Sequence, residues 1–218
     1  MDTVWIRKII IDALAHEKRT FELGYLLQSR LHHLHSAIHL SVTNPVANLL
    51  LFVRRYVERL PDILEAVGEI SARDDTEEIA EAVSERCAAL FAAPPALLDG
   101  HRGLNGCMNI AYMCHRLLEE INDSYLLAEG RMLAPIDTTR SNLIIHHLIG
   151  EGFANQLDDA VHLIARDLVM EKDTRGAPAR QDTDPSAIVE TLNRWPCLKD
   201  ELAGDMILFS PARLYNVH

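Results

Sequence analysis

Aromatic residues make up only 6% of this 218-residue chain, and no stretch of four or more residues alternates between apolar and polar side chains as a half-buried strand does. Leu, Ala and Ile dominate instead, which favours helices over a β-sandwich. The chain is 48% hydrophobic and 24% charged, and this ordinary globular composition excludes a disordered or collagen-like polypeptide. At this length we expect a single domain over residues 1–218.

Long apolar runs and recognisable catalytic motifs are also missing. No run approaches the roughly 20 residues that span a bilayer, so we expect no membrane association. The apolar run near Trp5 is too short for a signal peptide. Glycine-rich phosphate loops, the G-x-S-x-G elbow and the H-E-x-x-H motif do not occur. None of the cysteines forms a C-x-x-C pair, which excludes a zinc knuckle and predicts free thiols in a reducing cytoplasm; they are Cys87, Cys107, Cys114 and Cys197.

Positive charge is scarce in most of the chain. The formal net charge is −11, from 21 Lys and Arg against 32 Asp and Glu. Residues 1–59 carry a net charge of +3, so the remainder carries −14. Because affinity for nucleic acids comes mainly from a basic face that displaces counterions, this acidic bulk predicts a protein that does not bind nucleic acid.

Apolar residues recur at three- and four-residue steps almost throughout, which predicts helices. The first helix covers residues 3–42, either unbroken or broken near 18–20. Asn44 and Pro45 mark the start of the second helix, and Pro61 kinks or ends it. Asp75 and Glu78 form a capping box for the third. The remaining predicted segments are helices at 104–133 and 138–170, a mobile loop at about 172–184, and a short helix and tail within 185–218.

The best-patterned segment is the helical hairpin of residues 104–170. Matched apolar heptad rows on its two arms, joined by a short loop, predict antiparallel packing at the shallow angle of a four-helix bundle. Leu118 and Leu157 fall in its core. The predicted fold is therefore an all-α, up-and-down helical bundle with long antiparallel helices.

Histidine placement gives the main indication of chemistry. Among eleven histidines, His147 and His162 share one narrow strip of a helix with Glu151 and Asp158. On the other arm, His115 and Glu119 are one turn apart. Reflecting the hairpin about Ile136 brings the two strips to the same side, with His115 beside Asp158.

This arrangement predicts a divalent metal site formed by His115, Glu119, Asp158 and His162. Carboxylate oxygens and imidazole nitrogens suit Fe, Mn or Zn, and facing helices of a bundle are common places for such sites. Secondary candidate ligands are His35, His39, His147 and Glu151. The chain contains no Glu-x-x-His, the motif that ferritin-like di-iron proteins use.

Each of these residues also has a purely structural interpretation. His115 and Asp158 suit an ordinary ion pair between helices, and His147 suits a buried hydrogen bond. Two hypotheses for the function follow. One is a cytoplasmic helical-bundle protein with a His/carboxylate metal site, such as an oxidoreductase or oxygen-handling protein. The other is a non-enzymatic interaction or regulatory module whose histidines are structural.

We expect a homodimer, because the incomplete set of long helices and the apolar run at 206–209 call for a partner that completes the bundle. Sedimentation velocity at micromolar concentration should show a species of twice 24.5 kDa. A 24.5 kDa species that does not change with concentration contradicts this prediction.

Overall fold

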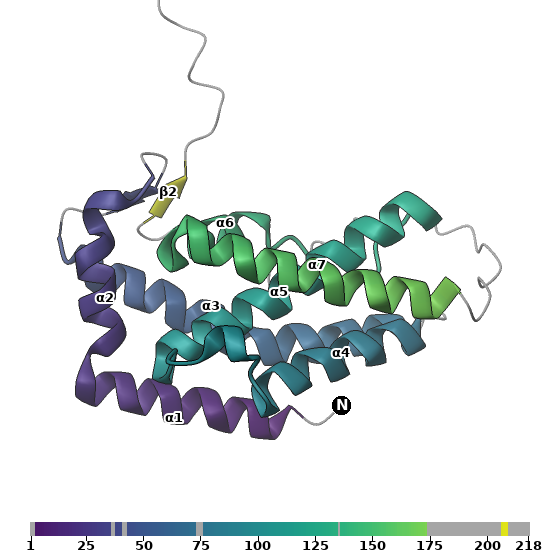
Figure 1. Ribbon diagram of the computed structural model, residues 1–218, viewed down its shortest axis with the longest axis horizontal. Coiled ribbons are helices and arrows are strands. Elements are labelled where there is room, and N and C mark those ends of the chain that lie inside the picture. Colours follow the sequence, from purple (N-terminus) through teal and green to yellow (C-terminus); the bar gives the residue numbers. More distant parts are fainter. Residues whose placement is uncertain are drawn as a thin grey trace, which may run out of the picture.

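The helices of the computed structural model follow the apolar periodicity of the sequence. The structure describes residues 3–35, 38–40, 43–72, 76–134, 136–173 and 206–208, and these include seven α-helices (Figure 1). They are α1 (Val4–Thr20), α2 (Glu22–Arg30), α3 (Pro45–Ser71), α4 (Glu77–Ala92), α5 (Gly103–Glu129), α6 (Thr139–Ile149) and α7 (Glu151–Asp173). Two short 3₁₀ turns lie at Leu31–His33 and Ala96–Leu98. The all-α prediction is confirmed.

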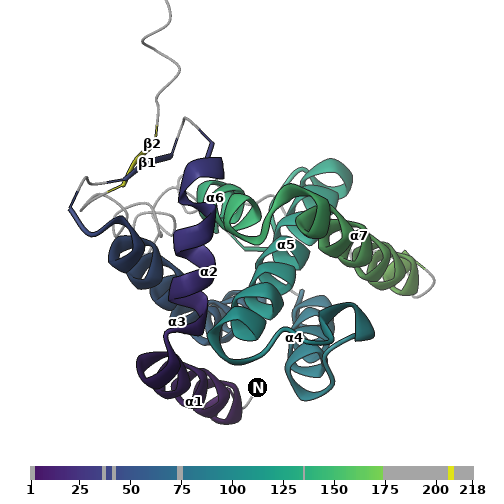
Figure 2. The same ribbon diagram turned by 60° about the vertical axis from the view of Figure 1, so that its left-hand side comes forward.

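Helix α5 lies at the centre of the molecule, and the other helices pack around it (Figure 2). It contacts α1, α2, α3, α4, α6 and α7. Its buried residues fall on nearly every face rather than on one stripe. Cys87, Cys107 and Cys114 are free thiols that are buried in the core, where a cysteine packs as a small hydrophobic residue. A helix hydrophobic on all sides belongs in the interior, and α5 organises a single contiguous core.

The N-terminal segment is broken into two helices, as one of the two alternatives predicts, but the α-helical part ends at Arg30 rather than near residue 42. Phe21 adopts a left-handed conformation with φ of 55°, and α2 begins at the next residue. The buried Glu17 carboxylate accepts hydrogen bonds from the backbone N–H groups of Leu23 and Gly24, both at 2.9 Å. A side chain from α1 thus satisfies orphan donors at the start of α2 and fixes the corner.

Helix α3 continues through Pro61 to Ser71, so the proline does not end it. Arg7 on α1 bonds to Asp62 at 2.8 Å and to Glu65 at 2.9 Å on α3. This charge-assisted link and the buried Ile6 and Ile10 hold α1 against the same helix.

The prediction of one helix over 138–170 is wrong, because α6 ends at Ile149 and α7 begins at Glu151. Gly150 between them has φ of 97°, a conformation that L side chains rarely adopt. Arg30 on α2 donates to the carbonyls of Leu148 and Ile149, so its guanidinium satisfies the orphan acceptors at the end of α6. The predicted packing of the first arm of the hairpin against the second is confirmed, with α5 contacting both α6 and α7.

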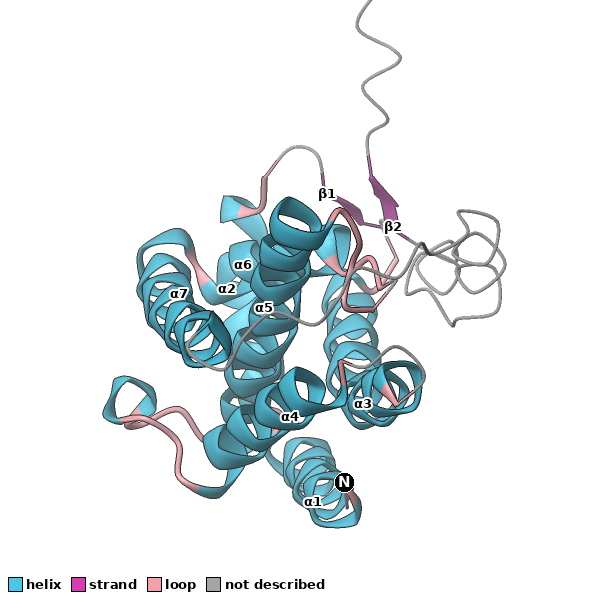
Figure 3. Cartoon of the chain, turned by 90° about the vertical axis from the view of Figure 1, so that its right-hand side faces the viewer, coloured by secondary structure: helices cyan, strands magenta, loops and turns pink. Residues whose placement is uncertain are grey.

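Two short strands were not expected from the sequence. Ile38–Leu40 (β1) pairs antiparallel with Met206–Leu208 (β2), with His39 opposite Ile207 (Figure 3). Three residues of the apolar run at 206–209 therefore pair with another segment of the same chain. The predicted helix and tail within 185–218 otherwise lie outside the described residues, as does the predicted loop beyond Asp173.

The core prediction for the hairpin has a direct test in stability. Leu118 and Leu157 are 3% and 0% exposed, so each Leu→Ala substitution should lower the free energy of unfolding by about 2–5 kcal/mol. Glu81→Ala on the exposed face of α4 should change it by less than about 0.5 kcal/mol. Urea denaturation gives these values, and equal small losses at all three positions contradict the packing.

Candidate functional site

Three carboxylates gather around the guanidinium of Arg116, where α5 and α7 meet. Arg116 Nη1 donates to Glu119 at 2.6 Å and Nη2 donates to Glu120 at 3.0 Å. Its Nε donates to Asp158 on α7 at 3.0 Å. We call these four residues the Arg116 cluster. One cation thus shares its donors among three anions, and the planar guanidinium presents those donors in a fixed fork.

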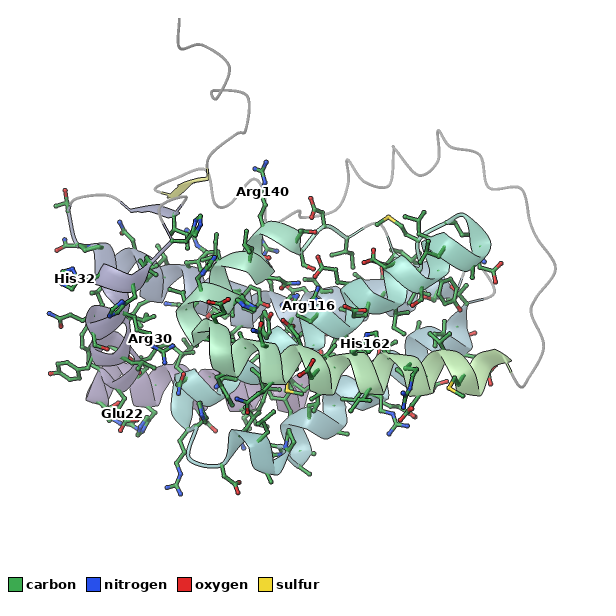
Figure 4. All side chains as sticks on the ribbon, turned by 45° about the horizontal axis from the view of Figure 1, so that its top comes forward. Glu22, Arg30, His32, Arg116, Arg140 and His162 are labelled. Carbon is green, nitrogen blue, oxygen red and sulfur yellow. The ribbon has the colours of Figure 1, made fainter. Side chains whose placement is uncertain are left out.

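Helix α5 places three of the four groups by its own geometry, and α7 supplies the fourth. Arg116, Glu119 and Glu120 lie at i, i+3 and i+4 on α5, and side chains at these spacings lie side by side on a helix surface. Asp158 comes from α7, which packs along α5. In Figure 4, Arg116 lies in the middle of the molecule, whereas Arg140 at the start of α6 projects away from it.

Helix α6 completes the hydrogen bonding of Glu119. Thr139 Oγ1 donates to one carboxylate oxygen at 2.8 Å, and Asn142 Nδ2 donates to the other at 2.8 Å. The buried hydroxyl of Tyr56 on α3 in turn donates to Asn142 Oδ1 at 2.7 Å. The Glu119 side chain is 16% exposed and accepts bonds from α5 and α6, so both of its carboxylate oxygens are bonded to protein donors.

Asp158 is held in a similar way from the other side. The Tyr112 hydroxyl donates to Asp158 Oδ1 at 2.8 Å and lies 2.9 Å from His146 Nδ1. Burial and the hydrogen bond to Asp158 raise the pKa of Tyr112 well above its ordinary value. Burial alone lowers the pKa of Arg116, but its bonds to Glu119 and Asp158 outweigh this and raise the pKa. Both groups therefore keep their protons throughout the physiological range.

The structure brings two of the four predicted metal ligands together and leaves the other two apart. Glu119 and Asp158 meet at Arg116. The His162 side chain is 71% exposed, and its Nδ1 lies 3.6 Å from Glu120 rather than from either predicted carboxylate (Figure 4). Within the described part of the chain, no three His, Cys, Asp or Glu side chains form a group that could hold a metal ion.

His115, the fourth candidate, is fully buried on the side of α5 that faces α3. Its ring packs on that of Tyr56 with centroids 4.4 Å apart, and its Nε2 lies 3.4 Å from the Tyr56 carbonyl oxygen. Its Nδ1 has no hydrogen-bond partner. Burial lowers the pKa of His115 to about 4, so the imidazole is neutral at pH 7.

Two of the secondary candidates, His147 and Glu151, lie at the junction of α6 and α7. The rings of His35 and His147 stack with centroids 5.2 Å apart, and the His146 ring lies edge-on to His147 at 6.0 Å. Burial, followed by the charges of His35 and His146, lowers the pKa of His147. Glu151 is an exposed residue at the start of α7. His39 lies in β1, and its side chain is outside the described residues.

Reasoning from the sequence missed Arg116, Tyr112 and Asn142, although one signal was available. An arginine one turn before two glutamates predicts that the carboxylates already have a cation. The reflection of the hairpin about Ile136 also assumed an unbroken second arm. Because the chain turns at Gly150, residues before and after it do not follow one helical register.

No family model, curated protein or solved structure matches the chain. Among the helices that the structure describes, none is both long enough and apolar enough to cross a membrane.

The buried His115 predicts a pH dependence of stability. An unfolded histidine takes up a proton below pH 6.5, whereas His115 in the folded protein stays neutral down to about pH 4. The free energy of unfolding should therefore fall as the pH drops from 6.5 towards 4, with a contribution from this residue of up to about 1.4 kcal/mol per pH unit. Urea denaturation across this range should show a shallower slope for His115→Leu.

The matched control is His162→Ala, which removes an imidazole that is 71% exposed. If the wild type and His115→Leu lose stability in parallel between pH 6.5 and 4, then His115 is not the group responsible.

Proposed function

We propose that this chain is a non-enzymatic helical module that acts by binding another protein, and that its histidines and its carboxylate cluster are structural. The observation that carries the proposal is the position of Arg116. Its guanidinium bonds to Glu119, Glu120 and Asp158, so a cation of the protein already occupies the position between these carboxylates.

The chemistry of the cluster supports a structural role. Tyr112 is hydrogen-bonded to Asp158, and Glu119 accepts bonds from Arg116, Thr139 and Asn142. A general acid or base needs a pKa near the working pH, and a nucleophile needs a nearby base to activate it. The shifts in pKa at Tyr112 and Arg116 run away from neutrality, which suits groups that hold helices together.

The outer surface supports a role in protein binding. Several large apolar side chains are well exposed among the described residues. Scattered examples are normal on a protein surface. Two of them, Ile11 and Leu51, line the same groove, which suggests an interaction site. The most exposed are Val4, Ile11, Tyr25, Leu127, Leu143, Leu163 and Met170. The homodimer that the sequence predicts is one example of a protein interaction through such a surface.

The alternative proposal is the His/carboxylate site for Fe, Mn or Zn, with an oxidoreductase or oxygen-handling role. It requires the carboxylates of the cluster to release Arg116 and bind the metal instead. A comparison of metal responses with and without Arg116 separates the two proposals.

Replacing Arg116 should both destabilise the protein and create a response to metal. Arg116→Met leaves three carboxylates without their cation, so we expect a loss of about 3 kcal/mol, the lower end of the range for a broken buried ion pair because the side chains are about one quarter exposed. Mn²⁺ should then raise the melting temperature of Arg116→Met, because freed carboxylates bind cations and native-state ligands stabilise by mass action. Differential scanning calorimetry measures both effects.

The wild type should melt at the same temperature in EDTA, Mn²⁺, Zn²⁺ and Fe²⁺. Arg140→Met, which removes an exposed arginine from the neighbouring helix, should behave as the wild type does. A wild-type melting temperature that drops in EDTA and returns with one of these metals contradicts the proposal and supports the metal site.

A further inference from the structure

A groove of about 490 Å³ lies between α1 and α3, away from the Arg116 cluster. The two helices pack against each other, and Leu104 in the first turn of α5 also lines the groove. Its floor is apolar and comes from all three helices. The apolar lining residues are Ile11, Leu14, Ala15, Leu50, Leu51 and Leu104.

The lining residues follow helical spacing along the groove. On α1 the lining runs from Ile11 to Lys18, and on α3 it runs from Leu50 to Glu58. At 1.5 Å per residue, both stretches are about 11 Å long, which is two turns of a helix. A helix bound in a groove contacts it through side chains at i, i+3 or i+4, and i+7, so this length matches three such anchors.

The apolar floor is accessible and extends beyond the groove. Ile11 is 62% exposed and Leu51 is 44% exposed, and both are large aliphatic side chains. Val4, which is 70% exposed, lies two turns before Ile11 on the same face of α1. An open strip of this kind suits a polypeptide better than a small molecule, which sites usually enclose on most sides.

The charges at the rim favour an acidic partner. Lys18 and Arg54 both line the groove. Lys18 has no ion pair or hydrogen bond within the part of the chain that the structure describes. The groove is also lined by Glu17, which accepts two backbone N–H groups, and by Glu58, which accepts a bond from Arg54 Nε. Arg54 therefore offers a partner its remaining guanidinium N–H donors, and Lys18 offers its whole ammonium group. Most lining residues belong to segment 1–59, whose net charge is +3 whereas the remainder carries −14, so an anionic partner meets less repulsion here than elsewhere on the protein.

We propose that this groove binds an amphipathic helix of a partner protein, with three apolar side chains on one face and carboxylates beside them. The apolar face packs on Ile11 and Leu51, and the carboxylates pair with Lys18 and Arg54. This inference rests on the proposed role as a binding module and assigns that role to one surface and one class of partner.

The test selects peptides without assuming a natural partner. A displayed library of amphipathic helical 18-mers, randomised at the residues that flank the apolar face, is selected against the full-length protein. We expect recovered peptides to be enriched in Asp and Glu. Their affinities are then measured by fluorescence anisotropy with purified variants whose melting temperatures match that of the wild type.

Ile11→Glu and Leu51→Glu should each weaken binding at least tenfold, because they place a carboxylate on the apolar floor. The double variant Lys18→Glu/Arg54→Glu should bind the selected acidic peptide more weakly than the wild type does. The same variant should bind a version of that peptide in which the Glu residues are replaced by Lys. Leu163→Glu, at a position on α7 that is 51% exposed, is the matched control and should bind as the wild type does.

Three results overturn the inference. The first is recovery of no peptides or of basic peptides, and the second is unchanged binding to Ile11→Glu and Leu51→Glu. In the second case, loss of binding at another exposed apolar position moves the interaction to that surface and leaves the proposed function standing. The third is conversion of a wild-type dimer into a monomer by Ile11→Glu, which makes a second copy of this chain the occupant. None of these results depends on the metal response, which tests the proposed function separately.

Discussion

The fold depends on how one guanidinium is shared among three carboxylates. Glu119, Glu120 and Asp158 come within reach of one another where α5 and α7 pack, and without a cation they would repel. Arg116 lies between them and converts that repulsion into a link across the two helices. Asn142 and Thr139 bring α6 to the same point through Glu119. The placement of three helices is thus specified by direction-dependent bonds in a region where apolar packing alone tolerates sliding.

This constraint matters because α5 is buried on nearly every side and still carries polar residues. Two of them show how such groups are accommodated. Asn122 bonds through both of its amide atoms to the backbone of Ala134, which fixes the segment between α5 and α6. His115 stays neutral against the ring and carbonyl of Tyr56. Buried amides and imidazoles with few alternative partners restrict the orientation of a central helix that would otherwise have several similar apolar faces.

Local patterns in the sequence predict the helices well and their connections less well. The start of α3 at Pro45 follows from the position of the proline, and the burial of Leu118 and Leu157 follows from apolar spacing. A break within the first segment is one of two alternatives that the spacing allows. The break at Gly150 does not, because a glycine within a helical pattern is tolerated and only the distant Arg30 reveals that α6 ends there. The prediction of the candidate site was limited in the same way, because it also depended on contacts with distant residues. Counting carboxylates and histidines on a strip identifies Glu119 and Asp158, but charge balance at a contact between helices depends on every neighbour, and Arg116 was not counted.

The central position of α5 also has a consequence for the order of synthesis. Helices α1, α3 and α4 all precede α5 in the chain and pack against it. About one hundred residues therefore leave the ribosome before the surface on which they pack exists, a wait of roughly 5–20 s at typical elongation rates of about 5–20 residues per second. Throughout that interval the apolar faces of three helices lack their main partner. Until α5 emerges, only the contacts of α3 with α1, α2 and α4 and of α1 with α2 are available, so a nascent chain of this design completes its core late.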